Sequence, residues 1–358
     1  MKRRRVFYHV EGWFGKLPPM DEPRDDASTD TRAAESGPGD SAPSQPPAVS
    51  TALSDSSSKY GLITPSPFEQ RVHKVFIGPD GLRPVWRFAF YLIVYRALYF
   101  ALQIVMYDGL PDLGQLRLQA VAYLGLAVVA VAATAIMARI EGRPLRTYGL
   151  PLRRAFGKMF WTGLLWGLIS LSLLLLVLHE AKTFDFGAMA LHGARLAKFA
   201  AFWAALYLSV GIYEEVFTRG YPQFTLTQAV GFWPAAILLS IGFGLLHVQN
   251  PGESWVGILG AIAIGFFFCL TLRRTGNLWF AVGFHTSWDW GESFLFSVPN
   301  SGAMVPGHLL HSSLHGSIWV TGGSVGPEGS IFLFVLIALL WAAFARLYPD
   351  VKYPDPTA

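Results

Sequence analysis

Two adjacent glutamates, Glu214 and Glu215, interrupt an apolar stretch at residues 200–220 that is long enough to form a membrane-spanning helix. Arg219 follows four residues after the second glutamate, so Glu215 and Arg219 share one face of such a helix. Charged groups are costly at membrane depth and usually face a bundle interior or a water-filled cavity. One glutamate can therefore pair with the arginine, which leaves the other free to act as a general base. The alternative is a buried ion pair that only locks two helices together.

Two later apolar stretches carry polar side chains of their own. His247 ends one of them, and Gly242 and Gly244 just before it allow helices to approach closely. His285 and Asp289 in the other stretch are four residues apart and face one groove. A histidine and a carboxylate placed in this way either ligate a metal or hold an oriented imidazole. Each histidine could also simply form a hydrogen bond that packs two helices.

These side chains could supply acid–base chemistry or bind a metal at membrane depth, as a hydrolytic reaction would require. Water is a poor nucleophile at neutral pH and needs a base or a metal to activate it. The oxyanion that forms next needs a hydrogen-bond donor or a cation in a site of low dielectric constant. The metalloprotease signature HExxH is absent from the sequence, so any metal site has to be assembled across helices. The sequence therefore predicts an enzyme whose site lies within the membrane.

The composition is that of a multi-pass membrane protein. The chain has 358 residues, of which 52% are hydrophobic and 15% are charged, whereas soluble domains carry about 25% charged residues. A net charge of +4 is too small to indicate a nucleic-acid partner. The single cysteine, Cys269, cannot form an intrachain disulfide and is best explained as a small packing residue.

Eight apolar stretches of about 20 residues follow residue 80, and this is the length that crosses a bilayer. They cover residues 86–107, 117–138, 158–179, 198–218, 232–249, 255–272, 278–297 and 330–347. Arginine and lysine are concentrated before the first stretch and at the even-numbered connections, and cytoplasmic loops hold the excess of these residues. We therefore predict an all-α polytopic bundle of about eight transmembrane helices with both termini in the cytoplasm.

Composition also divides the chain into regions. Residues 1–80 are rich in Pro, Ser and Asp and should form a disordered cytoplasmic region. Residues 81–350 should form the helical domain, and residues 351–358 a short cytoplasmic tail. Residues 141–158 mix basic residues with Leu, Tyr and Phe, which predicts either a segment along the cytoplasmic interface or a plain basic loop.

Three histidines, His308, His311 and His315, would share one face if their segment were helical. Three histidines can chelate zinc. We favour the alternative, an exposed loop in which they have no chemical role.

Taken together, the three polar motifs resemble those of a known family. Glu214-Glu215-Val-Phe-Thr-Arg219 fits the pattern E-E-x-x-x-R, Phe243-Gly-Leu-Leu-His247 fits F-x-x-x-H, and His285-Thr-Ser-Trp-Asp289 fits H-x-x-x-N/D. In this order they resemble the CAAX protease and bacteriocin-processing (CPBP, or Abi) family, over roughly residues 120–297. The resemblance implies a polytopic helical endopeptidase with its active site inside the membrane.

The resemblance also implies roles for the motif residues. Glu214 would activate water with the help of His247, while Glu215 and Arg219 would support that carboxylate and Phe243 would have a supporting place beside them. His285 and Asp289 would bind a metal or stabilise the oxyanion.

The cofactor is left open by these motifs. If a divalent metal such as zinc is used, the expected ligands are Glu214, His247, His285 and Asp289; the alternative is a metal-free mechanism. Prenyl-processing relatives usually have asparagine where this chain has Asp289. A carboxylate favours a cation more than an amide does, but it donates no hydrogen bond to an oxyanion unless it is protonated.

The predicted topology contains one conflict. Glu214 and His285 fall in the cytoplasmic halves of their spans, whereas His247 falls past the middle of its own span. Either the site sits near mid-bilayer or the fifth span is misplaced, and we favour the second explanation.

The sequence thus predicts an intramembrane endopeptidase that cleaves a membrane-associated protein or peptide. We expect it in a prokaryotic cytoplasmic membrane, with a peptide substrate and the lipid bilayer as partners and no nucleic acid. The alternatives are a non-catalytic membrane scaffold and an ion- or proton-coupled transporter, against which stands the absence of a detectable sequence repeat.

Overall fold

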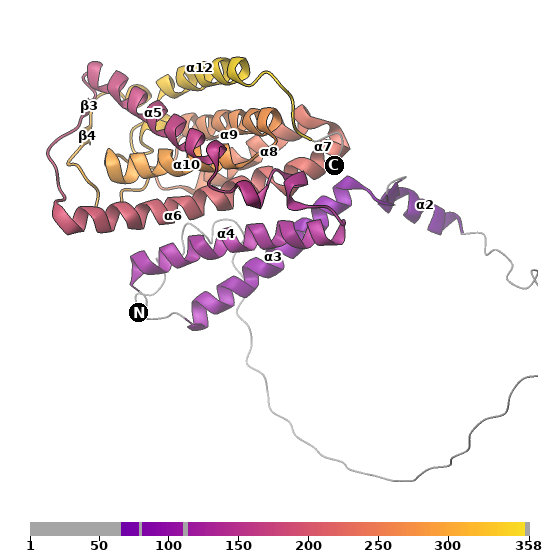
Figure 1. Ribbon diagram of the computed structural model, residues 1–358. Coiled ribbons are helices and arrows are strands. Elements are labelled where there is room, and N and C mark those ends of the chain that lie inside the picture. Colours follow the sequence, from indigo (N-terminus) through magenta and orange to yellow (C-terminus); the bar gives the residue numbers. More distant parts are fainter. Residues whose placement is uncertain (1–65, 79–80, 110–113, 355–358) are drawn as a thin grey trace, which may run out of the picture. The chain divides into compact units, whose positions relative to one another are not determined.

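The computed structural model describes residues 66–78, 81–109 and 114–354, and most of them are helical (Figure 1). The described chain from Phe76 onward forms one compact unit, while α2 up to Val75 belongs to another and is described by itself. The α-helices are α2 (Pro67–Phe76), α3 (Pro84–Gly109), α4 (Gln115–Ile140), α5 (Lys158–Glu180), α6 (Gly193–Arg219), α7 (Tyr221–Val230), α8 (Phe232–Leu246), α9 (Trp255–Thr275), α10 (Trp279–Trp290), α11 (Ile318–Thr321) and α12 (Ile331–Leu347). Two short antiparallel pairs complete the fold, β1 (Ile77–Gly78) with β2 (Gly81–Leu82) and β3 (Phe184–Asp185) with β4 (Ser313–Leu314).

Six helical segments of the described chain are long and apolar enough to cross a membrane. They are Pro84–Met106, Gln115–Ile140, Lys158–Glu180, Gly193–Val230, Phe232–Gln249 and Trp255–Thr275. Each overlaps one of the first six apolar stretches predicted from the sequence. The chain is therefore a multi-pass, all-α membrane protein, as expected.

The predicted count of eight spans is not confirmed, because the last two stretches form shorter helices. α10 has 12 residues and is followed by a π-helical turn, Gly291–Leu295, in place of one continuous helix over residues 278–297. Asp289 and Glu292 are both buried in this part of the chain, where charged groups oppose a continuous span. α12 has 17 residues, which is about 26 Å of helix against a hydrocarbon core of about 30 Å.

α10 is central to the bundle and packs on α5, α6 and α9 (Figure 1). Its tightest contact is with α5, where Gly163 and Gly167 form a G-x-x-x-G pair. A Cβ atom at Gly163 would overlap the carbonyl oxygen of Phe280, and one at Gly283 would overlap that of Phe160. Small residues let helix backbones approach closely in membranes, so α5 fixes the position of the helix that carries His285.

Two other glycines bring the remaining motif helices together. A Cβ at Gly211 of α6 would lie 3.1 Å from the carbonyl oxygen of Val282 in α10. A Cβ at Gly244 of α8 would lie 2.8 Å from the carbonyl oxygen of Ile258 in α9. The close approach predicted at Gly244 is thus present, whereas Gly242 faces open space.

The outer surface is apolar where a membrane would touch it. On α5, Trp161, Leu165 and Ile169 are 60%, 54% and 47% exposed, and they share one face of the helix. The opposite face carries the buried Gly163 and Gly167. This pattern is the one expected of a helix whose outer face meets lipid and whose inner face meets other helices.

A partly buried glutamate just after α4, Glu141, joins several elements. Glu141 accepts hydrogen bonds from the hydroxyl groups of Tyr148, at 2.9 Å, and Tyr221. The guanidinium groups of Arg87 and Arg143 lie 3.4 Å and 3.8 Å from its carboxylate. One carboxylate therefore connects α3, α4, α7 and the 3₁₀ turn Leu145–Tyr148.

Part of the predicted regional organisation falls outside the described residues. Residues 1–65 and 355–358 lie outside them, so disorder of the N-terminal region stays a prediction. Within residues 66–78 the structure contains α2, which the composition did not lead us to expect. The start of the predicted tail packs on the bundle, because the amide of Lys352 donates to the carbonyl of Arg273 and Tyr353 is buried.

We predict that Glu141→Ala lowers the stability of the bundle by about 2 kcal/mol, because two buried hydroxyls and two guanidinium groups lose a charged partner. The measurement is thermal unfolding of the detergent-purified protein. Glu180→Ala is the matched control, since Glu180 is exposed at the end of α5. Equal melting temperatures for the two variants would contradict this role for Glu141.

Candidate active site

A buried ion pair between Glu215 and Arg219 supports the site. Glu215 Oε1 accepts a hydrogen bond from Arg219 Nη1 at 2.8 Å, and the two residues are 0% and 1% exposed. The same carboxylate oxygen lies 3.0 Å from His285 Nδ1. Because the same Oε1 already accepts from Arg219, Nδ1 of His285 is the donor in this contact. The structure thus shows the alignment predicted for Glu215 and Arg219 and adds His285 to it.

Arg219 is held on several sides. Its Nε donates to the carbonyl of Gly265 in α9 at 3.3 Å, and its Nη1 donates to Thr218 Oγ1 at 3.0 Å. The guanidinium carbon lies 4.6 Å from the ring centre of Phe243 and 5.5 Å from that of Phe268. Aromatic faces stabilise a desolvated guanidinium, so the charge of Arg219 is fixed in one place.

The second nitrogen of His285 faces two further carboxylates. His285 Nε2 lies 3.6 Å from Glu214 Oε2 and 3.6 Å from Asp289 Oδ2. The side chain of Glu214 is 21% exposed, and its Oε2 has no hydrogen-bond partner. Three carboxyl groups and one guanidinium thus lie around this imidazole, and nearby carboxyl groups favour its doubly protonated form.

His247 reaches the site through Phe243. Its Nδ1 donates to the carbonyl oxygen of Phe243 at 2.8 Å, which leaves Nε2 without a proton in the neutral ring. The Phe243 ring meets the ring of His247 at 4.7 Å and the ring of His285 at 6.4 Å, edge to face in both cases. The three motifs, carried by α6, α8 with the 3₁₀ turn after it, and α10, therefore meet around one aromatic side chain.

The sequence placed His247 at a different depth from Glu214 and His285, and we explained this by a misplaced fifth span. That explanation is wrong. The observed segment Phe232–Gln249 has the bounds predicted for the fifth span. What the sequence did not indicate is α7, which adds ten residues, about 15 Å of helix, between α6 and α8 and packs on α8. Because of α7, α8 does not follow α6 directly. Phe243, near the C-terminal end of α8, nevertheless contacts Arg219 at the end of α6.

The four side chains expected to bind a metal do not form a metal site. Within the described residues, no group of three or more His, Cys, Asp or Glu side chains is arranged to hold a metal ion. Nδ1 of His285 is engaged by Glu215, and Nδ1 of His247 is engaged by Phe243. These contacts leave Nε2 of each ring as the nitrogen that could meet a metal, so the zinc site and the metal-free mechanism both stay predictions.

One acidic residue near the site was missed. Glu292 is fully buried in the π-helical turn, three residues after Asp289, and neither of its carboxylate oxygens has a hydrogen-bond partner of normal geometry. Its position in the apolar stretch 278–297, one turn from Asp289, was the signal that could have identified it. Further along the chain, Asn300 Nδ2 donates to the backbone carbonyl of Asp289 at 3.4 Å.

The three histidines of the C-terminal loop stay apart from these residues. His308 Nδ1 bonds the carbonyl of Val305 at 2.9 Å, and His315 lies beside Asp185 at the edge of the β3–β4 pair. His311 and His315 are both exposed. No described group of metal-binding geometry includes them.

Comparison with known families identifies the segment that carries the site. Residues 196–291 match the family model described as type II CAAX prenyl endopeptidase Rce1-like. This segment is similar to Rce1-like endopeptidases. It contains all three motifs, so the resemblance to the CPBP family is confirmed over these residues. No curated protein matches the chain.

Inside the Rce1-like segment, we predict that Gly265→Ala destabilises the site. The new Cβ would lie 2.7 Å from Arg219 Nη2 and 3.3 Å from Phe243, and overpacking of this kind costs about 1–3 kcal/mol. Gly242→Ala is the matched control, because nothing lies within 4 Å of its Cβ position. Thermal unfolding of both variants tests this, and an unchanged melting temperature for Gly265→Ala would show that Arg219 is not held tightly.

Proposed function

We propose that the protein is an intramembrane endopeptidase that hydrolyses a peptide bond of a membrane-associated protein or peptide. The observation that carries the proposal is the environment of His285. One of its nitrogens is fixed by the buried Glu215–Arg219 pair and the other faces the partly exposed Glu214. An oriented imidazole beside an accessible carboxylate, in an Rce1-like segment of a helical membrane protein, is suited to hydrolysis by activated water.

Glu214 is the residue we assign as general base. Its Oε2 is buried and has no hydrogen-bond partner among the described residues, while the side chain as a whole is 21% exposed. Glu214 takes a proton from water while the water oxygen bonds to the carbonyl carbon of the substrate. We assign His247 as its helper, because the bond from its Nδ1 to the Phe243 carbonyl leaves Nε2 free to accept a hydrogen bond from that water.

His285 is the residue we assign to the oxyanion. As water attacks, the electron pair of the carbonyl double bond moves to the oxygen, and a protonated Nε2 can donate to it. Asp289, 3.6 Å from Nε2, favours that protonated form. The intermediate then collapses as the carbon–nitrogen bond breaks, and the leaving amine takes the proton that Glu214 received.

The substrate class is proposed only as far as the site supports it. The matched family is described by its prenylated CAAX substrates. For this chain the proposal covers a membrane-associated peptide or protein, because the catalytic groups lie in helices of a membrane bundle. Any role for a prenyl group requires a substrate to be identified.

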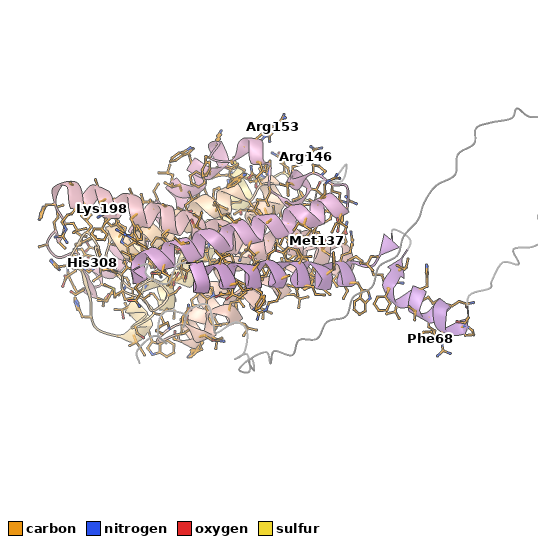
Figure 2. All side chains as sticks on the ribbon, turned by 90° about the horizontal axis from the view of Figure 1, so that it is seen from below. Phe68, Met137, Arg146, Arg153, Lys198 and His308 are labelled. Atoms are coloured by element: carbon orange, nitrogen blue, oxygen red, sulfur yellow. The ribbon has the colours of Figure 1, made fainter. Side chains whose placement is uncertain are left out.

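We further propose that both termini face the cytoplasm of a prokaryotic cell. Arg146 and Arg153 lie at one end of the bundle, and Lys198 and His308 lie at the other (Figure 2). The first end carries more basic residues, which supports its assignment to the cytoplasmic side.

Glu214→Gln and His247→Ala should each lower the rate of peptide cleavage by about 10²–10⁴-fold and leave thermal unfolding unchanged. The measurement is cleavage of a membrane-peptide library by the protein in proteoliposomes, with Glu180→Gln as control. Full activity of Glu214→Gln on a confirmed substrate would refute the assignment of the base. Flux of protons without cleavage would favour a transporter instead.

Asp289→Asn should keep at least a tenth of the activity, because an amide can donate to the oxyanion and no metal ligand is lost. Excess EDTA should likewise leave the rate unchanged. Elemental mass spectrometry of the purified protein and of the Asp289→Asn variant accompanies the assay. One bound metal per chain, lost together with activity in the variant, would overturn the metal-free assignment.

A further inference from the structure

A pocket of about 530 Å³ opens where α4 and α9 end and α5 and α10 begin. It contains none of the motif residues. Three stretches of chain surround it: residues 144–154 between α4 and α5, residues 275–277 between α9 and α10, and residues 352–353 after α12.

The rim of the pocket is strongly basic. Four of its lining residues carry a positive charge, and none carries a negative one: Arg146, Arg153, Arg154 and Lys352. All four side chains are exposed. None of them takes part in a salt bridge within the described chain, in contrast to Arg143 nearby, which pairs with Glu141. Like charges brought together without a counter-charge attract an anion.

A polar group inside the pocket also lacks a partner. Thr147 lines the pocket and is only 3% exposed, and its Oγ1 forms no hydrogen bond. Buried hydroxyl groups are nearly always hydrogen-bonded in folded proteins. An acceptor such as a phosphate oxygen would satisfy Thr147 and the surrounding guanidinium groups together.

The walls are held in place without a ligand. The amide of Leu278 donates to the carbonyl of Gly149 at 2.9 Å, and Trp279 Nε1 donates to the carbonyl of Pro151 at 3.3 Å. Gly149 takes φ +74°, a left-handed conformation that favours glycine. On the other side, Lys352 is fixed through its amide to the carbonyl of Arg273. A preformed site loses little conformational entropy when it binds.

The surroundings favour a lipid as the source of the anion. Leu152, Phe156 and Trp161 are 52%, 47% and 60% exposed beside the basic rim, and Phe156 packs on Trp279. Exposed Trp and aliphatic residues next to Arg and Lys at the ends of spans mark the membrane interface. Acyl chains can follow this apolar surface while the phosphate enters the pocket.

We propose that this pocket binds the phosphate headgroup of an anionic phospholipid in the leaflet at this end of the bundle. Each arginine near the headgroup should strengthen binding about fivefold. The proposal does not depend on the proposed peptidase activity, because binding is measured without a substrate.

The test uses the full-length protein purified in detergent and titrated with phosphatidylglycerol or phosphatidylcholine of the same chain length. Retained lipid is counted by native mass spectrometry. We expect one phosphatidylglycerol retained in preference to phosphatidylcholine. In Arg146→Gln/Arg153→Gln/Arg154→Gln the apparent affinity for phosphatidylglycerol should fall about a hundredfold. The matched control, Arg117→Gln/Arg195→Gln/Lys198→Gln, removes three exposed charges elsewhere and should bind as the unmodified protein does.

Thr147→Val keeps the shape of the residue and removes only a hydroxyl that has no partner in the protein. It should therefore fold normally and bind phosphatidylglycerol several-fold more weakly. Equal retention of the two lipids, or unchanged affinity in both the triple arginine variant and Thr147→Val, would overturn the proposal. Displacement of phosphatidylglycerol by an equal concentration of glycerol phosphate would show a site for free phosphate instead of lipid.

Discussion

The contact between Glu215 and Arg219 is the interaction on which the site depends. Removing one member of a buried pair leaves an uncompensated charge, which costs about 3–5 kcal/mol. Here both charges have further partners, since Arg219 bonds the backbone of α9 and Glu215 orients the imidazole on α10. The two charges thus compensate each other and also connect α6 to α9 and α10. The orientation of His285 follows from this pair more directly than from any contact within α10.

Backbone packing imposes the second constraint. α10 is too short to span the membrane alone, and it is positioned by the glycines of α5 and by Gly211 of α6. Between lipid-like surfaces the hydrophobic effect does not draw helices together. The helices are instead held together by close packing at glycines and by hydrogen bonds between buried polar groups. The site lies where both kinds of contact occur.

The sequence predicted which segments are helical better than where each helix ends and how consecutive helices are connected. The first six apolar stretches matched observed helices, because a long apolar run that satisfies its own backbone hydrogen bonds is what can cross a bilayer. α7 was missed because Tyr221–Val230 follows α6 across a single residue, Gly220, without a charged loop between them. The π-helical turn after Trp290 was missed because it depends on packing against neighbours. The pairing of Glu215 with Arg219 was predicted from spacing, whereas the contact of Glu215 with His285 spans 70 positions and required the fold.

Glu214 and Glu215 are neighbours in the chain, yet one side chain is 21% exposed and the other is 0% exposed. A rotation of about 100° along the helix therefore separates a partly exposed carboxylate from a fully buried one. Two adjacent residues of α6 thus give the bundle carboxylates of different accessibility within one helical turn, with no loop or second domain between them.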